Sequence, residues 1–88
     1  MIDPFRILSS FLFPPLFTVT FTDGVARCTR GKVALRTLEE FTQVAQASGL
    51  SSGTLHGVDR DGIVVLEFSR GIPEEARQRF RNVWGMVG

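Results

Sequence analysis

Residues 62–84 combine the most apolar strand candidate of the chain with its best helix candidate, and no other stretch constrains the fold as much. Ile63–Phe68 is β-branched and aromatic without Gly or Pro, which predicts a strand. Only Glu67 interrupts its apolar run, which favours a central position in a sheet. Pro73 fits the first position of a helix, where its missing N–H costs nothing. Apolar residues then recur at the spacing of one helical stripe, at Ala76, Phe80, Val83 and Trp84. We expect a strand that leads into a helix, with Trp84 in the core against that strand.

Residues 17–29 predict a β-hairpin. Phe17–Thr22 alternates strictly between apolar and polar side chains, and Asp23-Gly24 is the strongest two-residue hairpin signal. The return strand is Val25–Thr29, and the turn pairs each residue of one strand with a residue of the other. The resulting register puts five side chains on one face, namely Phe17, Val19, Phe21, Ala26 and Cys28. We therefore expect Cys28 to be a buried, inert residue and not a nucleophile.

A helix follows and ends at about Ser48. Thr37 has the spacing of a capping box with Glu40, although the helix could also begin nearer Ala34. The expected inward stripe is Ala34, Leu38, Phe41 and Ala45. Gly49 supplies the left-handed residue that ends the helix.

A second hairpin joins Gly53–Val58 to Ile63–Phe68 through a turn at residues 59–62. A symmetric pairing sets Val58 against Ile63 and Leu55 against Leu66. A bulged loop with Gly62 in the left-handed position would shift that pairing by one residue. We prefer the symmetric pairing because the bulged one sets Leu55 opposite a glutamate.

The expected fold class is α+β. Its architecture is a two-layer ββαββα sandwich, with a four-stranded, mainly antiparallel sheet and two helices on one face. Residues 16–88 form this single domain, and residues 1–15 form an apolar N-terminal arm or short helix. The other face of the sheet is expected to be polar, with Thr18, Thr20, Thr22, Arg27, Thr29, His56 and Glu67.

The apolar arm leaves three roles open: a lid over the core, a contact with a second copy, or a contact with a membrane surface. Its uncharged run, residues 7–22, covers 16 positions. That is short of the roughly 20 that a spanning helix needs, and Pro14-Pro15 interrupts it. Because every copy carries the same patch, we favour a homodimer through the arm. The candidate self-association residues are Phe5, Leu8, Phe11, Leu12 and Phe13.

Three segments of the chain resemble a bacterial family catalogued as a domain of unknown function, DUF3634. These segments are Gly31-Lys32-Val33, Glu67-Phe68-Ser69 with Ile72-Pro73, and Gln78 to Trp84. The resemblance covers about residues 16 to 85, and Arg81-Asn82-Val83-Trp84 is its most specific part. Many members begin with a longer apolar segment that resembles a membrane anchor, whereas this N-terminal stretch is short and carries two prolines. The resemblance implies no activity, cofactor or catalytic residue.

Catalysis and metal binding find little support in the sequence. His56 is the single histidine, and Cys28 points to the opposite face of the sheet, so a nucleophile and base pair is not formed. A lone cysteine excludes an internal disulfide and a Cys-based zinc site. Asp59-Arg60-Asp61-Gly62 resembles part of a calcium loop, but the remaining ligands are missing, so we interpret it as a turn. We expect no catalytic residue, no cofactor and no metal site.

Basic residues gather in two acid-free stretches, although the net charge is only +1. In a ββαββα layout the first helix begins, and the second ends, at the same edge of the sheet. The two stretches could therefore merge into one edge that binds an anionic ligand. Its candidate residues are Arg27, Arg30, Lys32, Arg36, Arg77 and Arg81.

The sequence favours a non-enzymatic protein-interaction or self-association module that binds a second copy or an unknown protein. The alternative is binding of a nucleic acid or an anionic surface through the basic edge, and a third is an enzyme that uses His56. Net charge gives no argument for nucleic acid as a partner. A single thiol and an N-terminus without the basic region of a signal peptide indicate the cytoplasm, with peripheral contact at the inner membrane left open.

Overall fold

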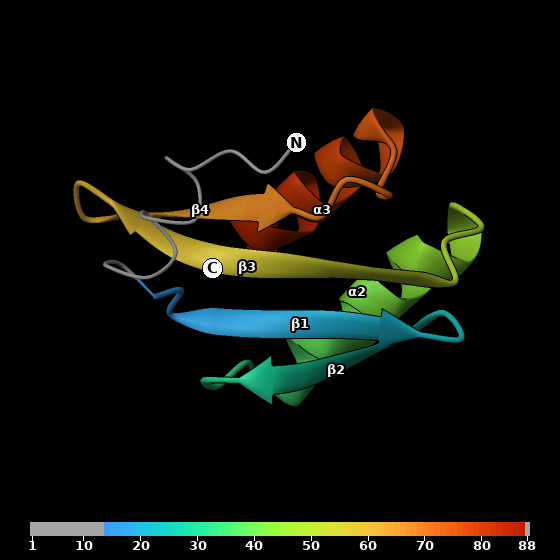
Figure 1. Ribbon diagram of the computed structural model, residues 1–88, viewed down its shortest axis with the longest axis horizontal. Helices are drawn as coiled ribbons and strands as arrows, with labels where there is room; N and C mark the ends of the chain where they lie inside the picture. Colours follow the sequence, from blue (N-terminus) through green and yellow to red (C-terminus); the bar gives the residue numbers. More distant parts are fainter. Residues whose placement is uncertain (1–13, 88) are drawn as a thin grey trace.

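The computed structural model describes residues 14–87, so residues 1–13 of the expected arm lie outside the described residues. The elements are, in chain order, β1 (Phe17–Thr22), β2 (Val25–Arg30), α2 (Leu35–Ala47), β3 (Ser52–Arg60), β4 (Ile63–Phe68) and α3 (Glu74–Val87). The strands form one antiparallel sheet in the order β2-β1-β3-β4. Both helices cover the same face of that sheet (Figure 1). The α+β ββαββα fold expected from the sequence is confirmed.

The first hairpin has the predicted turn and the predicted register. Asp23 and Gly24 both have positive φ, at 52° and 77°, as a two-residue type I′ turn requires. Phe21 pairs with Ala26 and Val19 pairs with Cys28. Phe17, Val19 and Phe21 are buried on the helix side, because alternate residues of a strand point to the same face.

Helix α2 (Leu35–Ala47) begins next to Ala34, the alternative start that the sequence left open, and one turn before the capping box at Thr37. Its N-cap is Ala34, which makes no side-chain capping bond. Thr37 lies inside the helix and is buried with Phe41 and Ala45, so the inward stripe runs through Thr37 and not through the exposed Ala34. An apolar periodicity does not include Thr37, because its hydroxyl makes it a polar residue although its methyl group can be buried.

The end of α2 is as expected. Gly49 has a φ of 69°. Its N–H donates to the carbonyl of Gln46 at 3.2 Å, and the Leu50 N–H donates to the carbonyl of Ala45 at 2.8 Å. These two bonds form a Schellman motif, and Leu50 closes it as a buried apolar residue.

The second hairpin has a different register from the one preferred on sequence grounds. Arg60 pairs with Ile63 and Leu55 pairs with Phe68, so the predicted pairing of Leu55 with Leu66 is wrong by two residues. Asp61 and Gly62, with φ of 56° and 85°, form a two-residue turn by themselves. A shift by two residues preserves the faces, so Leu55, Leu66 and Phe68 still lie on the helix side.

Strand β4 lies at an edge of the sheet, and the predicted central position is wrong. Its helix-side residues Leu66 and Phe68 are buried, but Ile63 and Val65 on the other face are 67% and 41% exposed. Helices cover only one face of β4, and only β3 pairs with it. An apolar run is therefore not sufficient to predict a central strand.

Phe80 of α3 is the centre of the core. Its ring is fully buried and lies 5.2 Å from Phe21, 5.5 Å from Phe41 and 6.0 Å from Phe68, measured between ring centroids. These three partners belong to β1, α2 and β4. One aromatic side chain therefore joins the sheet to both helices.

Trp84 lies at the margin of the core, where it packs as a partly buried residue. The side chain is half-buried and its ring centroid lies 5.2 Å from that of Phe17 in β1. Helix α3 thus crosses the sheet obliquely, since Arg77 and Arg81, nearer its start, lie over Phe68 of β4.

Candidate functional site

The sheet face opposite the helices carries no described helix (Figure 1). Alternation along the strands assigns each outward residue to this open face. It carries the polar residues expected from the sequence, which are Thr18, Thr20, Thr22, Arg27, Thr29, His56 and Glu67. It also carries Val25, Thr54, Val58, Arg60, Ile63 and Val65.

A polar row crosses the open face at Thr18, His56 and Glu67, which are direct neighbours on β1, β3 and β4. Thr18 Oγ1 and His56 Nδ1 are 2.9 Å apart, within hydrogen-bond distance. Glu67 forms an ion pair with Arg60. The predicted neighbourhood of His56 and Glu67 is therefore present, although their pairing comes from the corrected register of the second hairpin.

The arrangement around His56 gives a histidine between a hydroxyl and a carboxylate. Thr18, however, lies in the middle of a sheet strand, and the carboxylate of Glu67 is engaged by the Arg60 guanidinium. Cys28 lies on the helix-side face, where its thiol donates to the carbonyls of Arg30 and Gly31 at 3.2 and 3.4 Å. The open face thus carries two polar pairs, Thr18 with His56 and Arg60 with Glu67.

An apolar patch adjoins the polar row on the side of the β3–β4 turn. Val58 pairs with Val65, and the Leu16 N–H donates to the carbonyl of Gly57, the residue before Val58, at 2.7 Å. Ile63 lies in the next row of the same face. Leu16, Ile63 and Val65 are 53%, 67% and 41% exposed, and Val58 is half-buried. We call these four residues, Leu16, Val58, Ile63 and Val65, the hairpin patch.

The chain reaches the hairpin patch directly from its N-terminal arm. Pro14, the first described residue, precedes Leu16 by two positions. The predicted self-association residues Phe5, Leu8, Phe11, Leu12 and Phe13 lie outside the described residues. Two apolar segments of the chain are thus adjacent in sequence at this end of the sheet.

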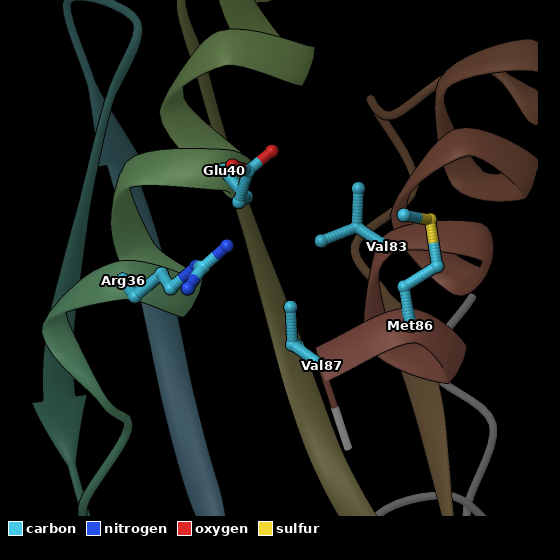
Figure 2. A pocket seen from close by; sticks show the side chains of 5 residues that line it. All are labelled: Arg36, Glu40, Val83, Met86 and Val87. Carbon is cyan, nitrogen blue, oxygen red and sulfur yellow. The ribbon is translucent and has the colours of Figure 1, made fainter.

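A groove of about 400 Å³ lies between the two helices. Figure 2 shows Arg36 and Glu40 of α2 on one side and Val83, Met86 and Val87 of α3 on the other. The groove confirms that α2 begins and α3 ends at the same end of the sheet. Its lining combines one cation, one anion and three apolar side chains, so it presents no single chemistry to a ligand.

The basic residues divide between the two edges of the sheet. Arg27 and Arg30 belong to β2, Lys32 follows that strand, and Arg36 begins α2 beside Glu40. Arg77 and Arg81 instead lie over Phe68 of β4, at 5.7 and 5.3 Å from its ring centroid. The strand order puts β2 and β4 at opposite edges.

Arg77 has a structural role that no pattern in the sequence indicates. Its Nε donates to the Ile72 carbonyl at 2.7 Å and its Nη2 donates to the Ser69 carbonyl at 3.1 Å. The guanidinium thus ties down the loop between β4 and α3. Arg81 is paired with Glu74 at 3.1 Å and Arg79 with Glu75 at 3.4 Å.

Asp59 serves the β3–β4 turn. Its Oδ1 accepts a hydrogen bond from the Gly62 N–H at 2.8 Å. Within residues 14–87, no group of three His, Cys, Asp or Glu side chains could hold a metal ion. In the same part of the chain, every helix is too short or too polar to cross a membrane.

Comparison with known families gives one result. The model of a family described as "Protein of unknown function (DUF3634)" matches residues 8–88, a range that includes every described strand and helix. Neither the curated proteins nor the solved structures compared with the chain contain a match.

Proposed function

Since the chain belongs to the DUF3634 family, whose description assigns no function, we propose from its surface that it is a non-enzymatic protein-interaction module that self-associates. The observation that supports the proposal is the hairpin patch. Three large aliphatic side chains are more than 40% exposed there, on a sheet face that is otherwise rich in Thr, Arg, His and Glu.

The hairpin patch is an exposed apolar surface, and the arm, residues 1–15, has an apolar sequence, so both favour cover by protein. Burying one Val, Leu or Ile side chain contributes about 1.5–3 kcal/mol, so a few such contacts stabilise an association. Every copy of the chain carries both surfaces. A homodimer in which the arm of one copy lies on the hairpin patch of the other removes both apolar regions from water.

Light scattering on the full chain at about 100 µM tests the proposal, since this concentration lies far above the micromolar range of a weak complex. We expect twice the mass of 9.8 kDa. Replacing both Phe11 and Leu12 by Ser should return the mass to that of a monomer. Ser9→Thr in the same segment is the matched control and should leave the dimer intact. A monomeric mass for the unchanged protein would contradict the proposal and favour an arm that covers its own domain.

The other sequence-based functions stay predictions. A cytoplasmic protein fits a self-associating module, and contact of the arm with a membrane surface is its alternative use. Binding of an anionic ligand has weaker support, because Arg77 donates to loop carbonyls and Arg81 is paired with Glu74.

A further inference from the structure

The two edge strands of the described sheet differ in how well they are protected. An unprotected edge exposes backbone N–H and C=O groups to another strand, and charged residues or bulges prevent such pairing. The β2 edge carries Arg27 and Arg30, and the register of its hairpin is irregular between Thr18 and Val19. The β4 edge has no Pro, Lys or Arg, and its one charged residue, Glu67, is bound by Arg60.

Strand β4 keeps uncovered apolar side chains on both of its faces. Ile63 and Val65 are exposed on the open face. Val64, on the helix side, is only half-buried, because α3 moves from β4 toward β1 as it crosses the sheet. Strand β4 therefore has the apolar residues of an interior strand but lies at the edge of the sheet, which indicates that another strand can pair with it.

The backbone groups that β4 directs outward follow from its pairing with β3. The Ser69 N–H donates to the Thr54 carbonyl at 2.8 Å, which marks this pair as hydrogen-bonded. Hydrogen-bonded and non-hydrogen-bonded pairs alternate along an antiparallel ladder. Val65 and Glu67 therefore bond to β3, and Val64 and Leu66 direct their N–H and C=O groups away from it.

We propose that β4 pairs antiparallel with β4 of a second copy around a two-fold axis, so that one sheet continues through both molecules. This inference rests on the proposed self-association and names a second surface for it. The second copy is the occupant that fits, because the same segment supplies the outward backbone groups and the uncovered apolar side chains on both sides of the axis.

Charge selects the register of this pairing. Side chains of paired residues must share a face, so the axis lies at a residue, and the two central residues of β4, Val65 and Leu66, allow the longest pairing. An axis at Leu66 would make the two Glu67 carboxylates diagonal neighbours at about 7–8 Å, where like charges repel. An axis at Val65 separates the two Glu67 residues by four strand positions, about 13 Å along the strand. Val65 then faces Val65 of the second copy, and Val64 bonds to Leu66 of the second copy.

The test is a symmetric disulfide in the full chain. Residues of a non-hydrogen-bonded pair have Cα atoms about 4.5 Å apart, which a disulfide can bridge. Val65→Cys in a Cys28→Ser background should give a covalent dimer under mild oxidation. Val25→Cys in the same background is the matched control, since Val25 lies on the protected β2 edge and is 39% exposed against 41% for Val65. We expect the control to remain a monomer on a non-reducing gel.

A second variant tests the pairing without a new thiol. Val64→Pro removes an N–H that points away from β3, so it leaves the β3–β4 ladder intact. We expect this variant to be a monomer by light scattering and to remain folded by circular dichroism. If the unchanged protein is a dimer but Val65→Cys cross-links no faster than Val25→Cys, the β4 pairing is wrong and the arm contact stands. A monomeric unchanged protein overturns both proposals.

Discussion

Gly57 and Phe17 show how one residue choice positions the aromatic end of the core. The two residues are direct partners on β3 and β1, and the Phe17 ring lies over the glycine. A Cβ at Gly57 would lie 2.1 Å from Cε2 of that ring, closer than any real contact. The missing side chain thus makes the space in which Phe17 is buried and meets Trp84.

Trp84 and Phe80 differ in burial, which ranks their contributions to stability. Phe80→Ala should lower the free energy of unfolding by roughly 3–5 kcal/mol, because the ring is fully buried among three others. Trp84→Ala should lower the free energy of unfolding by about 2 kcal/mol, because a half-buried side chain loses only part of its free energy of transfer from water when it is removed. Urea unfolding of both variants measures the difference.

The control for these two variants is Asn82→Ala. Asn82 is exposed on α3, and its Oδ1 accepts a bond from Gln78 Nε2 at 3.2 Å. Exposed substitutions of this kind stay within about 0.5 kcal/mol of the unchanged protein. A Trp84→Ala variant as stable as Asn82→Ala would show that Trp84 does not pack on Phe17 in solution.

At the scale of elements, the two hairpins use the same turn chemistry. Asp23-Gly24 and Asp61-Gly62 both place two residues at positive φ. An Asp tolerates this conformation and a Gly adopts it freely, whereas other residues are strained there. The turn residues therefore determine where each hairpin folds back.

Gly62→Ala and Gly85→Ala should change stability in opposite directions. Neither new Cβ has an atom within 4 Å, so packing does not contribute. Gly62 has a φ of 85°, and an alanine there should cost about 1 kcal/mol of strain. Gly85 lies in α3, where alanine should stabilise the helix by about 0.5 kcal/mol, less than in a helix interior because the helix ends two residues later.

Urea midpoints measured on the same day compare the two glycine variants directly. An unchanged midpoint for Gly62→Ala would indicate that the β3–β4 turn relaxes to another type. The Gly85→Ala variant shows in parallel that the method resolves a change of this size.

For the whole molecule, the separation of charges predicts weak binding to polyanions. The net charge is +1, and the six candidate basic residues divide between the β2 and β4 edges of the sheet. At about 0.15 M salt the Debye length is about 8 Å, so groups at opposite edges do not act together. We expect the protein to elute from heparin below about 0.15 M NaCl.

Retention on heparin at well above that salt concentration would contradict this expectation. A double charge change, Lys32→Glu with Arg36→Glu, would then locate the binding surface. Loss of retention in this variant would revive the anionic-ligand function at the β2–α2 edge.

The sequence alone determined the features that depend on neighbouring residues. The turn at Asp23-Gly24 fixed the register of the first hairpin, because positive φ at two successive positions leaves few ways to reverse the chain. Gly49 ended α2 for the same kind of reason. Alternating and helical apolar patterns gave the order ββαββα and the faces of the strands, since these periods are set by backbone geometry.

Only the tertiary structure decided which elements pack against each apolar side chain. An apolar run occurs both in central strands and in this edge strand, whose Ile63 and Val65 are exposed, so the edge position of β4 did not follow from the sequence. The ring contact of Trp84 with Phe17 of β1 did not follow from the sequence, because the crossing angle of α3 depends on every side chain beneath it. The joining of Thr18, His56 and Glu67 in one row likewise required the strand order, which comes from contacts between segments far apart in the chain.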